Sequence, residues 1–304
     1  MKIAITGATG FLGRYIVNRL SGNGHDCRCW FRPHSNRDGF DHSNGIEWQA
    51  GDLTQPDSYE SLCSGVDAVV HSALYRPAGM GFRASAQDAF EDFVRVNLMG
   101  SLQLMQTAFR LEIPRFVFIS TCAVHEVILD DRALDEAHPL WATTHYGAHK
   151  AAIEKFVHSF GLGQGWNICA VRPTGIYGTA TPAKNSRWFD IVRDVANGKA
   201  FSSDRGGKEV HAADVAKSVD VLLNADAEHT RGQAFNCYDQ YISEKHVAEL
   251  ARDISGSNAE IGGTNNGPKN QIETGKLRAL GMTFGGDEPL RATVSELVDA
   301  ARST

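Results

Sequence analysis

The sequence lacks features that would each indicate a different class of protein. The six cysteines among the 304 residues are scattered, without a C-x-x-C pair or a paired-histidine spacing, so neither a disulfide framework nor a zinc site is indicated. No basic run accompanies the net charge of -6, which argues against binding of nucleic acid. No apolar run approaches the ~18 residues of a membrane span, and MKIAIT is not a signal-peptide pattern. We therefore expect a cytoplasmic protein that acts on a small molecule, without a metal or a membrane partner.

What the sequence does contain is an alternation of strands and helices. With 42% hydrophobic and 22% charged residues, the composition is that of an ordinary globular protein. Hydrophobic periodicity predicts helices near 11–24, 58–63, 86–111 and from 146 onward, and strands at 2–6, 26–31, 45–50, 67–73, 115–120 and 167–173. This order predicts an α/β fold, the doubly wound parallel sheet of Rossmann type.

The pattern loosens after residue 173. The segment TGIYGTATPAKN is a loop punctuated by Gly and Pro, and helical segments follow near 186–197, 212–224 and 243–254. We expect a dinucleotide-binding domain over 1–173, with late elements returning to it from about 209–238. Residues 174–304 are then a smaller substrate-binding lobe at the carboxyl edge of the sheet, where ligands bind in such folds.

A glycine-rich turn, ITGATGFLG, joins the first strand to the first helix. Its spacing suits a pyrophosphate site: Gly7 permits a tight turn, Gly10 lets the phosphates approach the helix N-terminus, and Gly13 allows close packing. The alternative, a plain strand-to-helix turn, does not need three glycines. The residues expected to bind the cofactor here are Gly7, Thr9, Gly10, Phe11, Leu12 and Gly13.

The end of the second strand bears on which dinucleotide binds. A carboxylate there would bind the 2′-hydroxyl of NAD, but the chain has Phe31 and Arg32, with Arg14 close to the glycine turn. Guanidinium groups suit a 2′-phosphate, so NADP(H) is favoured and NAD(H) is possible. The alternative is that Arg32 is a solvated charge at the strand end.

Tyr146 and Lys150 lie four residues apart in THYGAHKAAIEKF, which places a phenol and an ammonium group on one face of a helix. A tyrosine of ordinary pKa, about 10, is a poor acid or base near neutrality. A neighbouring cation favours the phenolate and lowers that pKa. The pair is therefore a candidate proton-transfer device.

Several motifs together resemble the extended short-chain dehydrogenase/reductase superfamily, which includes NAD-dependent epimerases and dehydratases. They are TGATGFLG, the Tyr146/Lys150 pair, Thr121 in FISTCAV, Asn97 in VNLMGS, Asp52-Leu53, VDAVVHSA and VRPTGIYG. The resemblance covers nearly the whole chain. It implies a Rossmann fold and a proton-transfer apparatus, and leaves the substrate open.

The resemblance implies specific roles for the catalytic residues. Tyr146 is the general acid/base, Lys150 lowers the pKa of Tyr146 and holds the nicotinamide ribose, Thr121 hydrogen-bonds the reacting oxygen, and Asn97 positions the lysine through a water. Other cofactor contacts are implied for Asp52, Leu53, Ser72, Ala73, Leu74, Pro173 and Thr174. The resemblance also implies a homodimer formed by the helix at 86–111 and the Tyr146 helix.

Some residues depart from the nucleotide-sugar epimerases, which commonly carry Asn and Arg at the positions of Thr174 and Gly207. These departures weaken a UDP-sugar assignment. Asp214 is a candidate N-cap of the following helix. Arg76 is a candidate to bind cofactor phosphate or a substrate anion. The candidate substrate contacts are Thr121, Tyr146, Cys122, His125, Arg187 and Trp188.

Three functions are compatible with these residues. The first is an NAD(P)-dependent oxidoreductase that moves a hydride between nicotinamide and a hydroxyl or carbonyl carbon. The second is a nucleotide-sugar epimerase or dehydratase, in which the cofactor stays bound. The third, a dinucleotide-sensing regulator, is disfavoured because the chain keeps both Tyr146 and Lys150.

Overall fold

A computed structural model describes residues 1–41, 45–77 and 79–303 of the chain. These residues form two compact units. The first comprises Met1–Pro173, Val215–Cys237 and Ile272–Met282, and the second comprises Thr174–Asp214, Tyr238–Gln271 and Thr283–Thr304.

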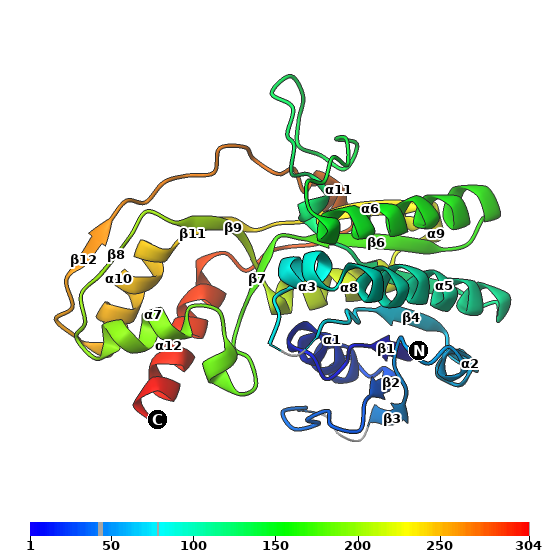
Figure 1. Ribbon diagram of the computed structural model, residues 1–304, viewed down its shortest axis with the longest axis horizontal. Helices are drawn as coiled ribbons and strands as arrows, with labels where there is room; N and C mark the ends of the chain where they lie inside the picture. Colours follow the sequence, from blue (N-terminus) through cyan, green and yellow to red (C-terminus); the bar gives the residue numbers. More distant parts are fainter. Residues whose placement is uncertain (42–44, 78, 304) are drawn as a thin grey trace. The chain divides into compact units, whose positions relative to one another are not determined.

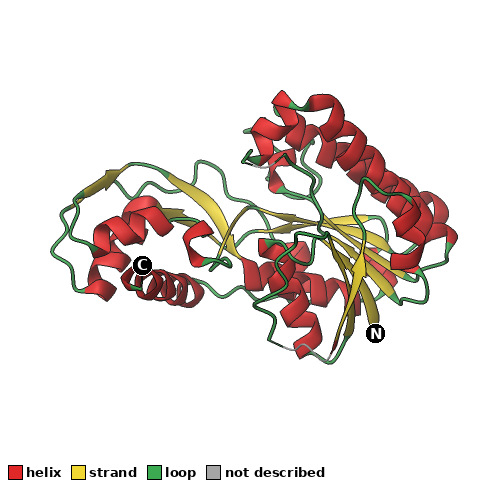
Figure 2. Cartoon of the chain, turned by 60° about the horizontal axis from the view of Figure 1, so that its bottom comes forward, coloured by secondary structure: helices red, strands yellow, loops and turns green. Residues whose placement is uncertain are grey.

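The first unit is built on a seven-stranded parallel sheet with the order β10-β6-β5-β4-β1-β2-β3. Helices flank the sheet (Figures 1 and 2), which confirms the predicted Rossmann-type fold. The chain order reverses between β1 and β4, where the ends of neighbouring strands diverge and ligands bind in such sheets. The strands are β1 (Lys2–Thr6), β2 (Asp26–Phe31), β3 (Ile46–Ala50), β4 (Ala68–His71), β5 (Arg115–Ile119), β6 (Ile168–Pro173) and β10 (Gln233–Cys237).

Apolar side chains between the sheet and its helices form the core of this unit. Phe116 and Phe118 of β5 pack with Leu104 and Met105 of α5 and with Ile153 of α6, all buried. The helices of this unit are α1 (Phe11–Gly22), α2 (Asp57–Cys63), α3 (Phe82–Asp88), α4 (Phe90–Phe93), α5 (Gly100–Arg110), α6 (His145–His158), α8 (Ala212–Asn224, which begins in the second unit), α9 (Ala227–Thr230) and α11 (Gly275–Ala279).

The single helix predicted over 86–111 is wrong. The chain bends at Ala89, and a π-helical turn, η2 (Val94–Met99), lies between α4 and α5. A π-turn has a wider hydrogen-bond spacing, so it changes which residues face inward relative to an uninterrupted α-helix. In α4, before this turn, Phe93 is buried and Phe90, predicted on the same apolar stripe, is 47% exposed.

The second unit contains two small sheets and a helical layer. Its sheets are β11-β9-β7 and β12-β8, and its core includes Tyr177, Val192, Val247 and Leu297. The elements are β7 (Gly175–Tyr177), β8 (Phe201–Ser203), β9 (Gly206–His211), β11 (Gln240–Ser243), β12 (Ile261–Gly263), α7 (Phe189–Ala196), α10 (Glu244–Ser255) and α12 (Asp287–Arg302). Most of these strands are too short for hydrophobic periodicity to reveal them.

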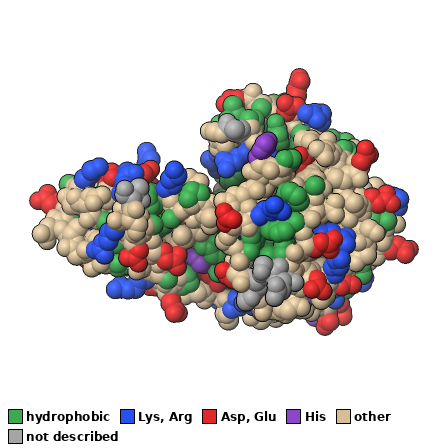
Figure 3. Space-filling view, turned by 90° about the horizontal axis from the view of Figure 1, so that it is seen from below, with side chains coloured by type: hydrophobic (Ala, Val, Ile, Leu, Met, Phe, Trp, Pro, Cys, Tyr) green, Lys and Arg blue, Asp and Glu red, His purple; other side chains and the backbone are tan. Residues whose placement is uncertain are grey.

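Within the described ranges, no helix has both the length and the apolar character that crossing a bilayer requires. Figure 3 shows acidic and basic side chains interspersed over the visible face, as expected for a chain with a modest net charge.

Candidate active site

The glycine turn after β1 is shaped by close backbone contacts. Gly7 has a φ of 70°, and a Cβ added there would lie 2.8 Å from the nitrogen of Ala73. A Cβ at Gly13 would lie 2.0 Å from the carbonyl oxygen of Gly7. Gly10 precedes α1 without a side-chain cap, so the first-turn amides of this helix have no capping oxygen. The turn therefore fits a pyrophosphate, which would accept hydrogen bonds from those amides.

A buried polar network lies beneath this turn. Thr6 Oγ1 accepts from the amides of Ser72 and Ala73, each at 3.1 Å, and bonds His71 Nδ1 at 2.7 Å. His71 Nε2 lies 2.8 Å from Ser101 Oγ, which donates to the carbonyl of Asn97. Burial lowers the pKa of His71 to about 3. The imidazole is thus neutral, and it links β1 and β4 to α5.

Asn97 bonds the backbone of Tyr75, and its implied role of positioning the lysine through a water stays a prediction. Its Nδ2 donates to the carbonyl of Tyr75 at 2.9 Å, and its Oδ1 accepts from the amide of Tyr75 at 2.6 Å. Both amide atoms therefore hold the loop after β4, which carries Ser72, Ala73 and Leu74. In the structure Asn97 positions this loop by direct bonds.

Tyr146 lies in the first turn of α6, which begins after the N-cap Thr144, whose hydroxyl accepts from the Gly147 amide at 3.1 Å. Thr121, two residues after β5, lies close to Tyr146, and its side chain lowers the pKa of the phenol. Burial is the larger cause and raises that pKa, while the charge of Arg83 lowers it. The structure thus brings Tyr146 and Thr121 together, and their catalytic roles stay a prediction.

Lys150 does not act on the phenol as expected. Its Nζ donates to the carbonyl of Ile119 at 2.7 Å and lies 4.5 Å from the centre of the Phe118 ring. Burial lowers the pKa of Lys150 to about 7, against the opposing charge of Glu154. The predicted lowering of the Tyr146 pKa by Lys150 is therefore replaced, in this structure, by the effects of Thr121 and Arg83.

His125 and Cys122, predicted as substrate contacts, have structural partners. His125 is 5% exposed, with Nε2 3.1 Å from Arg172 Nη1 and Nδ1 3.3 Å from the carbonyl of Pro139. The Cys122 thiol donates to the carbonyl of Arg172 at 2.9 Å. Both ring nitrogens of His125 thus have protein partners, and a substrate role for His125 stays a prediction.

Arg172 forms a buried ion pair behind these residues. Its Nε and Nη2 contact the carboxylate of Glu154 on α6, the latter at 2.6 Å, and both side chains are at most 1% exposed. Ser120 Oγ also donates to Glu154. The pair therefore joins β5, β6 and α6 directly behind the Tyr146–Thr121 pair.

The arginines relevant to the choice between NAD and NADP lie near the end of β2. Arg14 is 6% exposed; its Nη2 donates to the carbonyl of Asn36 at 2.7 Å, and its Nη1 is buried without a partner. Arg37, which sequence reasoning missed, lies 4.8 Å from the centre of the Phe31 ring. The Arg32 amide donates to Ser35 Oγ at 3.0 Å, and the Arg32 side chain is exposed.

Asp52 and Leu53 follow β3. Asp52 Oδ1 accepts from the amide and hydroxyl of Thr54. Leu53 is 6% exposed and packs in the core with Trp30 and Tyr59. Leu53 thus belongs to the core of this unit, and its expected contact with the adenine ring stays a prediction.

The remaining predicted residues lie in two places. Arg76 donates to the carbonyl of Met80 at 2.8 Å, and Pro173 ends β6. In the second unit, Arg187 pairs with the buried Glu209 at 2.6 Å, and Trp188 is 8% exposed in the apolar core.

Thr174, Gly207 and Asp214, which the sequence singled out, lie in the second unit. The Thr174 hydroxyl is buried without a partner. A Cβ at Gly207 would lie 2.3 Å from a carboxylate oxygen of Glu209, so the buried carboxylate explains the glycine. Asp214 is not the predicted N-cap: it lies inside α8, which begins at Ala212, and accepts from the amide of Gly285.

Sequence reasoning missed Phe82, Arg83 and Glu126, because they lie outside every predicted strand and helix. Phe82 stacks on Tyr146 with ring centres 5.7 Å apart. It also missed His149, one residue before Lys150, which is 4% exposed and whose pKa burial lowers to about 3. Of these residues, only His149 lies close enough in the sequence to the Tyr146/Lys150 motif for that motif to have drawn attention to it.

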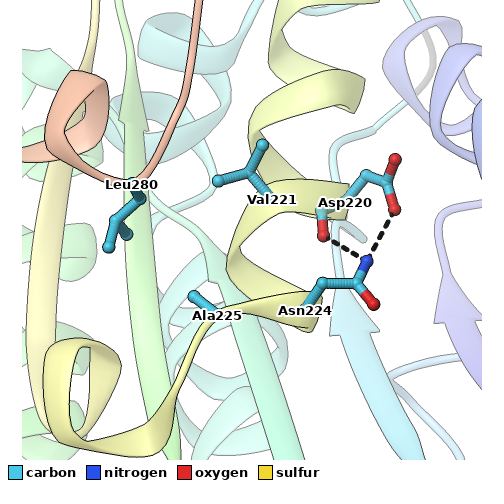
Figure 4. A pocket seen from close by; sticks show the side chains of 5 residues that line it. All are labelled: Asp220, Val221, Asn224, Ala225 and Leu280. Atoms are coloured by element: carbon cyan, nitrogen blue, oxygen red, sulfur yellow. Dashed lines mark hydrogen bonds between the residues drawn. The ribbon is translucent and has the colours of Figure 1, made fainter.

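A separate pocket is lined by Asp220, Val221, Asn224, Ala225 and Leu280 (Figure 4). Asp220 accepts from Arg19 and Asn23 at the end of α1. This end of α1 is opposite to the glycine turn, so we assign the pocket no part in the chemistry. Among the residues that the structure describes, no group of three or more His, Cys, Asp or Glu side chains is arranged to hold a metal ion.

Comparison with known proteins identifies a family whose model covers most of the chain. The model of the NAD dependent epimerase/dehydratase family matches residues 3–237. A trifunctional UDP-glucose 4,6-dehydratase, 3,5-epimerase and 4-keto-reductase of Arabidopsis thaliana is 27% identical over 83% of this chain, and the chain spans only 39% of its length.

A ketoreductase of Stigmatella aurantiaca, which acts on a farnesyl dihydroquinoline oxide, is 29% identical over 86% of this chain and 75% of its own. Among solved structures, the UDP-glucose 4-epimerase of Thermus thermophilus in complex with NAD superposes with a TM-score of 0.78. It is 20% identical, and the whole of each chain is covered.

Proposed function

The chain belongs to the NAD-dependent epimerase/dehydratase family, and from this premise we propose that it is an NAD(P)-dependent oxidoreductase acting on a hydroxyl or carbonyl carbon of a small molecule. The observation that carries the proposal is the position of Tyr146 in the first turn of α6, with the Thr121 side chain near enough to lower the pKa of its phenol. A phenol and a hydroxyl placed together can both bond one substrate oxygen.

In the proposed mechanism the residues of this chain bind, orient and move a proton. The bound nicotinamide supplies or accepts the hydride. Thr121 holds the substrate oxygen, and Tyr146 gives that oxygen a proton during reduction or takes one during oxidation. The amides of the glycine turn would hold the pyrophosphate, and Lys150, released from the Ile119 carbonyl, would hold ribose hydroxyls.

Epimerisation is the second candidate, supported by the family and by the UDP-sugar relatives. Dehydration is less well supported, because expelling a hydroxyl group needs a second acid near the phenol. The carboxylates nearest the start and middle of α6 are engaged: Glu126 accepts from Thr143 and Thr144, and Glu154 pairs with Arg172.

The experiment that separates these functions follows the cofactor. The purified protein is incubated with NADPH or NADH and with panels of simple carbonyls and nucleotide sugars. We expect stoichiometric consumption of the reduced cofactor with a carbonyl compound. Tightly retained cofactor, together with sugar interconversion and no net consumption, would instead establish an epimerase.

We also propose that the cofactor is NADP(H). The support is a set of guanidinium groups around the end of β2: the buried Arg14 with its unpartnered Nη1, the exposed Arg32, and Arg37 over Phe31. A 2′-phosphate carries the charge and the acceptors that such groups bind. NAD(H), which the solved epimerase binds, is the alternative.

Replacing Arg32 with Ala tests this choice. If Arg32 contacts the 2′-phosphate, NADPH affinity should fall about tenfold or more, in line with a charge-assisted hydrogen bond, while NADH affinity changes little. Calorimetric titration of both cofactors measures the ratio. An unchanged NADPH/NADH ratio in the variant would remove Arg32 from the proposal.

A homodimer remains a proposal. The support is the exposure of large apolar side chains on the elements that the resemblance assigns to the interface, namely Phe90, Met99 and Phe156. Sedimentation equilibrium would detect the dimer, and a monomer at micromolar concentration would contradict it.

A further inference from the structure

Three large apolar side chains near the start of α6 are exposed to water. Phe82, Val127 and Trp141 are 48%, 42% and 51% exposed. Phe82 belongs to α3, which packs against α6 (Figure 1). Its ring is stacked on the Tyr146 ring, with ring centres 5.7 Å apart and 19° between the ring planes. An exposed apolar surface therefore begins directly beside the phenol.

Glu126 ties the segment that carries Phe82 to the segment that carries Trp141. Its carboxylate accepts from Arg83 Nη2 at 3.1 Å, and Arg83 directly follows Phe82 in the chain. The same carboxylate accepts from the amide of Thr143 at 2.6 Å, two residues after Trp141. Two segments that lie far apart in the sequence thus meet at one carboxylate.

Val127 extends this surface from a third segment. It follows Glu126 in the chain, and its amide donates to the carbonyl of Trp141 at 3.0 Å. Phe82, Val127 and Trp141 form what we call the apolar rim. Through the stack of Phe82 on Tyr146, the apolar rim is continuous with the reactive phenol.

The charged groups beside the apolar rim are held by other parts of the protein. Arg83 pairs with Glu126, so the two charges offset each other. Arg76 donates to the carbonyl of Met80 at 2.8 Å, and its guanidinium carbon lies 5.1 Å from the centre of the Phe82 ring. The rim itself therefore offers apolar surface beside the phenol.

We propose that the apolar rim binds an apolar part of the substrate, and that the substrate is a ketone or alcohol carrying an apolar ring or chain. The inference rests on the proposed function, in which Tyr146 contacts the reacting oxygen. A molecule that reaches the phenol lies beside Phe82, because the two rings are stacked. Covering the rim removes apolar surface from water, which favours binding, and exposed apolar patches mark binding sites.

The test compares two ketones that share a carbonyl ring and differ in apolar size, cyclohexanone and 4-phenylcyclohexanone. Calorimetry measures their binding to the full chain in the presence of the oxidised cofactor that binds more tightly, so that no hydride is available for reduction. We expect 4-phenylcyclohexanone to bind about tenfold more tightly, because its phenyl group covers the apolar rim. Equal affinities would overturn the inference.

Variants of exposed residues locate this preference. Trp141→Ser should remove most of the preference for 4-phenylcyclohexanone. Val127→Thr keeps the β-branched shape and should reduce it about threefold, the effect of about one methyl group. Leu162→Ser is the control, because Leu162 is 67% exposed and lies beyond the far end of α6, so the preference should stay. An unchanged preference in Trp141→Ser, or an equal loss in Leu162→Ser, would overturn the inference.

Turnover of the same ketones with reduced cofactor separates this inference from the proposed function. Reduction of both ketones with equal kcat/KM would support the function and overturn the inference. A binding preference that Trp141→Ser removes, without reduction of either ketone, would support the apolar rim as a binding site and contradict the function. Tighter binding of UDP-glucose than of 4-phenylcyclohexanone would overturn the inference. A dimer that dissociates in Trp141→Ser, with the ketone preference intact, would assign the rim to a second copy of the chain and overturn it too.

Discussion

Tyr146→Phe is expected to lower kcat by about 10²–10⁴-fold, the usual contribution of a general acid or base, and to leave cofactor affinity close to that of the wild type. The substitution removes one hydroxyl and keeps the ring, so the stack with Phe82 is preserved. Thr121 would still accept from the amide of Ala123. The loss would therefore report proton transfer rather than misfolding.

Steady-state rates with the substrate from the carbonyl panel, together with calorimetric cofactor binding, measure this effect. Thr121→Val is the companion variant, because it removes the other hydroxyl that contacts the phenol and keeps the β-branched shape. We expect it also to lower kcat. A Tyr146→Phe enzyme with the wild-type rate would show that another group transfers the proton.

Breaking the buried Arg172–Glu154 pair is expected to produce the largest loss of stability. Glu154→Leu leaves a guanidinium 1% exposed without its carboxylate. Removing one partner of a buried pair typically costs about 3–5 kcal/mol. Ser120 and His125, which also bond to this pair, would lose or rearrange hydrogen bonds, so the free energy of unfolding should fall by that amount.

Urea denaturation of the cofactor-free protein measures the change. The double variant Glu154→Leu/Arg172→Met replaces both charges by apolar side chains and should recover much of the loss. The exposed pair Arg110–Glu60 provides the control: Glu60→Gln should change stability by less than about 1 kcal/mol. A Glu154→Leu variant as stable as this control would contradict the role of the buried pair.

The catalytic motif shows which features of the site can be predicted from the sequence alone. The spacing of Tyr146 and Lys150 puts them on one helix face, and Thr121 follows a strand whose carboxyl end must lie at the ligand-binding edge of a parallel sheet. These relations depend on local periodicity and sheet topology, so the sequence could predict them. The partner of Lys150 is the Ile119 carbonyl, on another element, and no local pattern encodes that contact.

His125 and Asn97 show where local patterns mislead. His125 lies in a predicted polar loop, yet it is 5% exposed and contacts Arg172, 47 residues away in the chain. Asn97 faces Tyr75 because a π-turn alters the helix. Both outcomes depend on contacts between segments that are distant in sequence.

By itself the sequence determined the Rossmann-type fold and the glycine turn, because the order of strands and helices and the glycine spacing can both be read along the chain. It also predicted Tyr146 as the proton-transfer residue. Only the tertiary structure decided which charges surround the phenol. Arg83, Glu126 and Tyr146 come from three separate segments, and burial sets the pKa of Lys150. Electrostatic effects depend on distance and on exclusion of water, and both exist only once the segments have packed together.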